Sequence, residues 1–305
     1  MLNISMRVLP LFFRTMIAYL FPTLFPCFSA LLLPHPSLPP SSSSSPSPVH
    51  TVLNDPPKNI YCIGDIHGCH SEFLSLLSKI RSLEGGDPCY LRSVILVGDL
   101  VNKGPSSLST LRYCREHRIL SVRGNHDVAA LSVYRGTKSV RPDQSSKYGW
   151  VSSMSEDDAS YLQSLPCTVS FEAGGRNHVV VHAGLVPGVP LFLQSESDMT
   201  TLRLVRRVGS GEGGSYKATR GGEGEEGGGE LPWAKVYDGE HGRVVFGHDA
   251  KRGLQVNDNA VGLDTGCVYG REITAVKIGR DDGKIEFISS PCEEPGGYAP
   301  VSRGS

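Results

Sequence analysis

Five short apolar runs in the sequence each end in a loop that contains glycine and polar side chains. A single Gly-Asp pair after a strand is most often only a turn, so the ordered recurrence is what favours chemistry. Carboxylate, imidazole and amide donors together suit divalent ions such as Mn, Fe, Zn or Co, and without thiolates they do not suit a structural zinc site. The candidate ligands are Asp65, His67, Asp99, Asn125, His182 and His248.

Alternating strands and helices must position the first of these loops. Residues 59–63, 93–97 and 119–122 are short apolar runs, and a helical pattern from Phe73 to Ile80 and a helix after Pro105 separate them. This alternation predicts consecutive βαβ units that form a parallel sheet. Ligands of open α/β sheets bind outside the carboxyl ends of the strands, so we expect these loops to converge on one crevice.

Later apolar runs predict a second, more antiparallel sheet. Two of them end in histidine beside glycine, which places His182 and His248 at strand ends. Between the two sets, residues 155–158 fit a capping box ahead of a helix that Pro166 would end. The expected strands of this second sheet are residues 178–181, 243–246, 260–263, 273–278 and 285–289.

The composition excludes one broad class of function. The chain has 305 residues with 30 Lys and Arg against 31 Asp and Glu, and its formal net charge is −1. A balanced charge excludes the basic excess that drives general nucleic-acid binding. Any phosphate chemistry must therefore come from a local site.

The N-terminal segment, residues 1–33, is expected to be a signal or targeting segment. It carries Arg7 and Arg14 ahead of an apolar stretch, an order that resembles a secretory signal, whereas its lack of acids also fits a transit peptide. A transit peptide, a membrane anchor and a misassigned start codon remain alternatives. The favoured location of the protein is the secretory pathway or an organelle, and a wrong start codon would favour the cytoplasm instead. The protein would associate with a membrane only if this segment is retained as an anchor.

Many of the 21 prolines lie before Lys58, and a dense group of the 35 glycines lies in residues 209–230, which suggests domain boundaries. Residues 34–57 are rich in Pro and Ser and are expected to form a disordered spacer. The catalytic domain is expected at 58–290, with a structureless Gly/Glu-rich surface insert at 209–230 and a flexible tail at 291–305. The eight cysteines form no C-x-x-C pair, and Cys62 is expected to be a small buried hydrophobe.

Taken together, the motifs GDIHG, GDLVNKG, GNHD and the two histidine loops resemble the calcineurin-like metallophosphoesterases of the phosphoprotein phosphatase superfamily. The resemblance covers roughly residues 58–289. It implies an α/β fold of four layers (αββα), a two-sheet β-sandwich flanked by helices. It also implies two divalent ions: Asp65, His67 and Asp99 would hold one, and Asp99, Asn125, His182 and His248 the other. Two neighbouring cations need a shared anion, here Asp99.

The same resemblance implies roles for further residues. His126 would protonate the leaving oxygen, and Asp127 would orient the imidazole of His126. Lys103 would bind a phosphate oxygen as a point charge. Arg203 resembles a second phosphate-binding arginine of the family, and Arg206 is a competing candidate. From the residue pattern alone, His178 shares a strand face with His182, so a role in supporting that ligand is an alternative, but packing in the core or at the surface is favoured. Trp150 and Trp233 are expected to pack in the core rather than contact substrate.

Two positions separate the branches of this superfamily. Serine/threonine protein phosphatases carry Asp-Arg-Gly where this chain has Asn102-Lys103-Gly104, and Glu where it has Asp127. The sequence is closer to the ApaH-like (diadenosine tetraphosphate hydrolase-like) phosphatases. That resemblance implies a small phosphorylated or nucleotide-type substrate, cleaved at a phosphoanhydride or phosphomonoester bond. A lysine cannot grip phosphate bidentately, which disfavours the alternative of a protein phosphatase. A non-catalytic metal-binding scaffold is a second alternative, disfavoured because every ligand position is filled.

Overall fold

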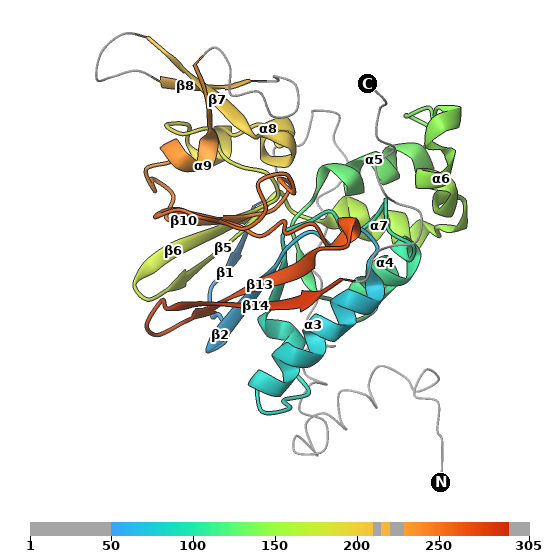
Figure 1. The fold of residues 1–305 in the computed structure, drawn as a ribbon, viewed down its shortest axis with the longest axis horizontal. Coiled ribbons are helices and arrows are strands. Elements are labelled where there is room, and N and C mark those ends of the chain that lie inside the picture. The colour runs from blue at the N-terminus through green and yellow to red at the C-terminus, as the bar shows by residue number, and fades with distance from the viewer. Residues whose placement is uncertain (1–49, 210–214, 220–228, 293–305) are drawn as a thin grey trace, which may run out of the picture.

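Two β-sheets packed face to face form the centre of the molecule (Figure 1). The computed structural model describes residues 50–209, 215–219 and 229–292. The five-stranded sheet has the order β14-β13-β2-β3-β4, and the six-stranded sheet has the order β1-β5-β6-β10-β12-β11. The strands of the first are β2 (Asn59–Ile63), β3 (Val94–Leu96), β4 (Leu120–Ser121), β13 (Glu272–Gly279) and β14 (Ile285–Pro291), and those of the second are β1 (His50–Leu53), β5 (Thr168–Ala173), β6 (Arg176–Val181), β10 (Arg243–Phe246), β11 (Gln255–Val256) and β12 (Ala260–Gly262).

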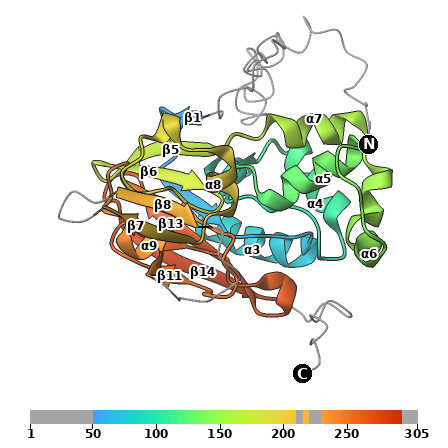
Figure 2. The same ribbon diagram turned by 90° about the horizontal axis from the view of Figure 1, so that it is seen from above.

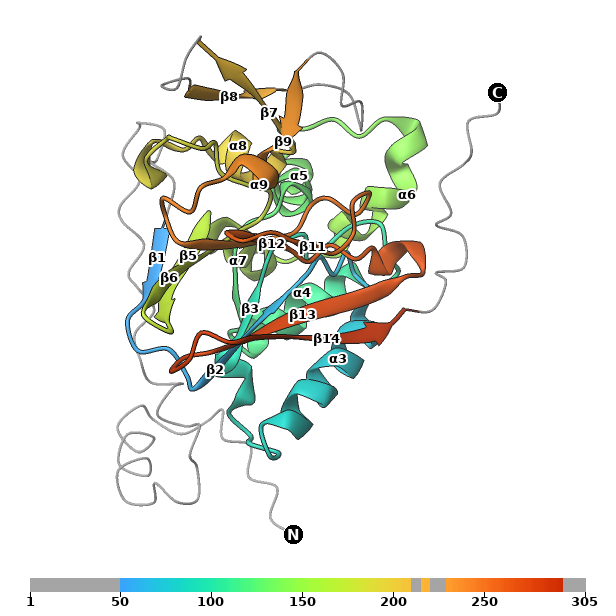
Figure 3. The same cartoon turned by 60° about the vertical axis from the view of Figure 1, so that its left-hand side comes forward.

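Helices cover the outer faces of both sheets. Figure 2 shows α4 to α7 gathered to one side of the strands, and α8 and α9 lie on the other sheet with the small sheet of β7, β8 and β9 beyond them (Figure 3). The bounds are α3 (His70–Leu83), α4 (Ser107–Glu116), α5 (Asn125–Tyr134), α6 (Ser145–Tyr148), α7 (Glu156–Ser164), α8 (Glu196–Thr201), α9 (Trp233–Val236), β7 (Leu204–Val208), β8 (Ser215–Thr219) and β9 (Glu230–Pro232).

Strand β2 shows why the sequence forms layers. Its side chains alternate between two faces, as those of any strand do. Tyr61 and Ile63 pack against the helices, whereas Ile60 and Cys62 pack between the two sheets. All four side chains are buried, which is typical of a strand covered on both sides. The predicted four-layer αββα fold is confirmed, and so is Cys62 as a buried hydrophobe.

The expected assignment of strands to sheets is partly wrong. Strands β13 and β14 belong to the first sheet, where β13 pairs antiparallel with β2. The six-stranded sheet is mixed, since β10 runs parallel to both β6 and β12. The reason lies in β13, which buries Ala275 toward the helices and Val276 between the sheets. A strand with two apolar faces is more stable inside the sandwich than at its edge.

Two segments expected to lack structure contain strands. Residues 50–53 of the predicted spacer form β1, which pairs parallel with β5. Residues 215–219 of the predicted insert form β8, because Tyr216 and Ala218 alternate with polar residues and pack against the core beside α9. Both predictions of disorder are wrong at these positions. The predicted targeting segment, residues 1–33, lies outside the described residues.

Helix boundaries follow their local signals. The predicted capping box is confirmed: Ser155 Oγ accepts a hydrogen bond from the Asp158 backbone N–H, and the Asp158 carboxylate accepts one from the Ser155 N–H. The helix then ends at Ser164, ahead of Pro166. Helices α3 and α4 also lie where the sequence predicts them. Within the part of the chain that the structure describes, no helix is both long and apolar enough to cross a membrane.

Candidate metal centre

All six candidate ligands follow strands and meet at one end of the sandwich. Asp65 and His67 follow β2, Asp99 follows β3, and Asn125 is the first residue of α5 after β4. His182 and His248 follow β6 and β10 of the other sheet. The crevice expected for the parallel strands therefore receives ligands from both sheets.

Asp99 lies between two groups of donor atoms. Its Oδ2 is 3.5 Å from His67 Nε2, and its Oδ1 is 3.4 Å from His182 Nε2. His67 Nε2 is also 3.8 Å from Asp65 Oδ2. On the other side, Asn125 Oδ1 is 3.1 Å from His182 Nε2 and 3.0 Å from His248 Nδ1. The Asp99 side chain is buried, so one carboxylate faces both groups away from bulk water.

The donor atoms fit two divalent ions that share one carboxylate. Single ligand atoms of His67, Asp99 and His126 lie within 4.8 Å of one another, and so do those of Asp99, His182 and His248. Burial holds the pKa of His67 and His248 well below the usual range, so both imidazoles keep a lone pair for a metal. Lys103 Nζ lies 2.9 Å from His67 Nε2, so a positive charge stands beside the first group of donors.

Backbone conformation at the site is unusual. Six non-glycine residues among those described have a positive φ, and five of them lie in the ligand loops. A positive φ costs about 1–3 kcal/mol for such a residue and persists only where the surroundings enforce it. Strain concentrated in these loops is typical of a functional site. The five residues are His67, Asp99, Asn102, Lys103 and His248.

Two glycines allow the loops to pack this closely. A Cβ on Gly124 would lie 2.2 Å from Asp99 Oδ1, and one on Gly247 would lie 2.0 Å from Asp65 Oδ1. Any side chain there would displace a ligand carboxylate. The glycines beside Asn125 and His248 therefore let their loops pack closely against the loops that carry Asp99 and Asp65.

Asp127 does not orient His126, so this prediction is wrong. Its carboxylate accepts hydrogen bonds from three backbone N–H groups, those of Asp99 at 2.9 Å, Leu100 at 3.0 Å and Gly124 at 2.9 Å. Asp127 is the third residue of α5 and is buried, so its carboxylate points back to the start of the helix rather than to the neighbouring ring. It fixes the second loop against the third.

We expect Asp127→Ala to destabilise the fold by about 3 kcal/mol or more, because three buried N–H groups lose their acceptor. Denaturant unfolding followed by tryptophan fluorescence measures the change, with His126→Asn as the neighbouring control that keeps these hydrogen bonds. Unchanged stability with slower turnover would instead support the orienting role.

His126 lies against the first group of donors. Its ring contacts the ring of His67 edge-on at 4.7 Å between centroids, and its backbone N–H donates to Asp99 Oδ1 at 2.8 Å. Burial lowers the pKa of His126 to about 3. Its Nδ1 is buried and finds no hydrogen-bond partner among the described residues. A pKa this low favours the neutral imidazole, which can bind an ion; for His126 to donate a proton, a nearby anion must raise its pKa.

The two arginine candidates lie in different places. Arg203 Nη2 donates to the backbone oxygen of His248 at 3.0 Å, and its Nε is 4.0 Å from Asp249 Oδ1. Arg206 pairs with Glu230 on the small sheet at 3.0 Å. Only Arg203, whose side chain is 39% exposed, combines access to solvent with contact to a ligand loop. Arg203 therefore lies at a ligand loop, whereas Arg206 lies on the small sheet.

Two residues near the site were missed. Asp264 is buried, and the pKa of Asp65, raised well above its usual range by burial, is raised further by this second carboxylate. The signal was available, because Asp264 follows an apolar run and precedes Thr265-Gly266. Tyr269 places its ring 5.4 Å below Lys103 Nζ. Tyr269 could not be predicted in the same way, because its contact with Lys103 is not part of a pattern at the end of a strand.

The residues expected to pack in the core mostly do so. Trp233 is buried against Phe246, and His178 stacks on Phe171 with ring centroids 5.1 Å apart. Trp150 packs against the core only in part, since its indole N–H donates to Asn102 Oδ1 at 3.0 Å. It therefore also contacts the second ligand loop.

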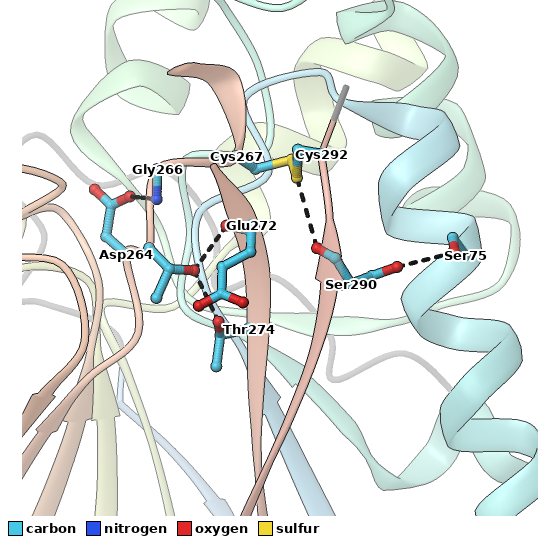
Figure 4. The surroundings of a disulfide bond; sticks show 9 residues. Ser75, Asp264, Gly266, Cys267, Glu272, Thr274, Ser290 and Cys292 are labelled. Atoms are coloured by element: carbon cyan, nitrogen blue, oxygen red, sulfur yellow. Dashed lines mark hydrogen bonds between the residues drawn. A yellow bond between two sulfur atoms is a disulfide. The ribbon is translucent and has the colours of Figure 1, made fainter. Parts of the chain in front are cut away.

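A disulfide holds the loop that carries Asp264 and Tyr269. Cys267 in that loop is bonded to Cys292 at the end of β14, 25 residues further on (Figure 4). Ser290 of the same strand contacts Ser75 of α3 through their hydroxyl groups at 3.0 Å. The two cysteines thus join the site loop to the outer edge of the first sheet, and the predicted tail at 291–305 begins with two ordered residues.

We expect Cys292→Ser to lower the free energy of unfolding by about 3 kcal/mol, as estimated for a closed loop of this length. Unfolding in urea without and with a reductant measures the effect. The reductant should destabilise the wild type more than the variant, in which Cys89 is still disulfide-bonded. An equal response of both proteins would contradict a stabilising disulfide.

A β-sandwich with a paired donor site at its strand ends defines a metallophosphoesterase, and the comparisons agree. Residues 58–252 match the family model of the calcineurin-like phosphoesterases. The chain belongs to this family and is a metal-dependent hydrolase of phosphoric ester or anhydride bonds.

Three relatives are similar over most of their length. The symmetrical bis(5'-nucleosyl)-tetraphosphatase of Methylobacillus flagellatus is 30% identical over 289 residues, which cover 79% of this chain and 98% of that protein. The enzyme of the same name from Burkholderia thailandensis is 27% identical, covering 76% and 94%. A crystal structure of a protein assigned as a diadenosine tetraphosphatase superposes with a TM-score of 0.64 at 34% identity, covering 80% and 98%.

Proposed function

We propose that this chain hydrolyses dinucleoside polyphosphates at an internal phosphoanhydride bond. The observation that carries the proposal is the pair of donor groups that share Asp99, with Lys103 beside them. The names of the relatives support the substrate class. Small nucleotides are also consistent with a chain whose own charge is balanced.

We assign the metal ligands as the resemblance implies. Asp65, His67 and Asp99 hold one divalent ion, and the other is held by Asp99, Asn125, His182 and His248. When bound, two such ions lower the pKa of water and neutralise charge on the phosphoryl oxygens. The mixed oxygen and nitrogen donors favour Mn, Fe, Zn or Co as the ions.

The other side chains bind and orient the substrate. Lys103 contacts a phosphate oxygen as a point charge, and Tyr269 supports its ammonium from below. Arg203 contacts a second phosphate from the rim. The oxygen of a water molecule becomes bonded to phosphorus and one water proton is released to solvent. The bridging P–O bond breaks, and His126 gives a proton to the departing nucleoside phosphate.

A substrate panel tests this proposal. The full chain is assayed with Mn, Zn, Co or Mg on diadenosine tetraphosphate, inorganic polyphosphate, a phosphopeptide and p-nitrophenyl phosphate. We expect metal-dependent hydrolysis with the highest kcat/KM for diadenosine tetraphosphate. A phosphopeptide cleaved far faster than the anhydrides would support the protein phosphatase instead. No turnover of any substrate would support a binding scaffold.

A further inference from the structure

An open cavity lies beside the metal centre, between α5 and the following segment of α6 and η4 (Gly149–Ser153). Its volume is about 610 Å³, which is within the range of small-molecule sites. Hydrophobic and aromatic side chains make up much of its wall. They include Val133, Tyr134, Val140, Tyr148 and Val151.

Two lysines flank the aromatic wall. Lys138 Nζ and Lys147 Nζ lie 5.4 and 5.3 Å from the centre of the Tyr148 ring, and Lys138 also donates to Tyr148 Oη at 3.3 Å. Within residues 50–209, 215–219 and 229–292, no carboxylate forms an ion pair with Lys103, Lys138 or Lys147. Positive charge that forms no ion pair with a carboxylate favours an anionic ligand.

Two structural elements link the cavity wall to the metal centre. Helix α5 begins at the candidate ligand Asn125 and reaches the cavity at Val133, which is about 12 Å further along the helix axis. Trp150, from the wall segment, donates to Asn102 in the second ligand loop. A ligand with phosphates at the metal centre can therefore extend into the cavity past Lys147.

We propose that this cavity binds one nucleoside of the substrate, with Lys138 and Lys147 contacting the phosphate chain that leads to it. The inference rests on the proposed function, since it names the part of the substrate that the cavity holds. A polyphosphate chain alone would use the lysines but not the apolar wall. A nucleobase uses both, because any base can stack on an aromatic side chain.

Gly149 offers a clean test because it lines the cavity and tolerates a side chain. Its φ is −56°, and a Cβ built there meets no atom within 4 Å. Gly149→Leu therefore fills part of the cavity without straining the backbone. Gly149→Ala is the matched control, and Tyr134→Ala removes stacking area from another wall.

We expect Gly149→Leu to raise KM for diadenosine tetraphosphate about tenfold or more with little change in kcat, a loss in the range of one stacked base. Its kcat/KM for inorganic tetraphosphate should stay within about twofold of the wild type, because this substrate has no nucleoside. The substitution removes only an interaction that binds the nucleoside equally well before and during the reaction. Tyr134→Ala should show the same split, and Gly149→Ala should match the wild type. Thermal melts confirm that the variants are folded.

Three outcomes would overturn the inference. Equal losses on both substrates would show that the substitution disturbs the metal centre, and unchanged kinetics on both would show that the cavity holds no nucleoside. A wild type that cleaves inorganic tetraphosphate but not diadenosine tetraphosphate would refute the proposed function itself, and the inference with it.

Discussion

Replacing Asp99 with asparagine is expected to remove both metal ions and to lower kcat/KM for diadenosine tetraphosphate by about 10³-fold or more. Asparagine keeps the shape of the side chain and an oxygen for the His126 N–H. It loses the negative charge that faces both His67 and His182. Unit charges 4 Å apart at an effective dielectric constant of about 20 interact by about 4 kcal/mol, which corresponds to about 10³ in rate.

Metal content by mass spectrometry, together with kinetics, measures this result. Asn125→Ala is the matched variant, because the Asn125 side-chain oxygen lies in the group of His182 and His248. It should weaken one ion and spare the other. Retention of both ions by Asp99→Asn would contradict a shared carboxylate.

Replacing His126 with asparagine is expected to leave both ions bound and to slow hydrolysis by about 10²–10⁴-fold, the usual contribution of a general acid. The backbone N–H of residue 126 still donates to Asp99, so the ligand loops keep their geometry. A substrate whose leaving group is more basic should be slowed more, since it depends more on the proton.

The same variant separates two roles of His126. Its imidazole can join His67 and Asp99 around one point, as a ligand would. The loss of one ion in His126→Asn would assign it as a ligand and contradict the acid role. A loss of activity with both ions retained supports the acid role, and His67→Asn serves as the control that loses an ion.

The site was easier to predict from the sequence than the arrangement of the strands. Ligand loops depend on local signals, an apolar run followed by glycine and a donor, and the structure brings all six predicted ligands together. The partner of β13 depends on which of its two apolar faces meets which sheet. That choice is made by packing between residues far apart in the chain, which no local pattern shows.

Errors at the site have a similar cause. The sequence places Asp127 next to His126, but the helix turns neighbouring side chains in different directions, and the Asp127 carboxylate reaches the backbone of the preceding loops. In β8, composition suggested disorder while the alternation of Tyr216 and Ala218 was enough to form a strand. Adjacency and average composition are weaker guides than side-chain direction.

Titration of Mn²⁺ into metal-free protein, with hydrolysis of diadenosine tetraphosphate followed at each step, tests the two-ion site directly. We expect no turnover without metal and full activity only when two ions are bound per chain. Turnover by the metal-free chain, or full activity with a single ion bound, would contradict a two-metal phosphoesterase built around Asp99.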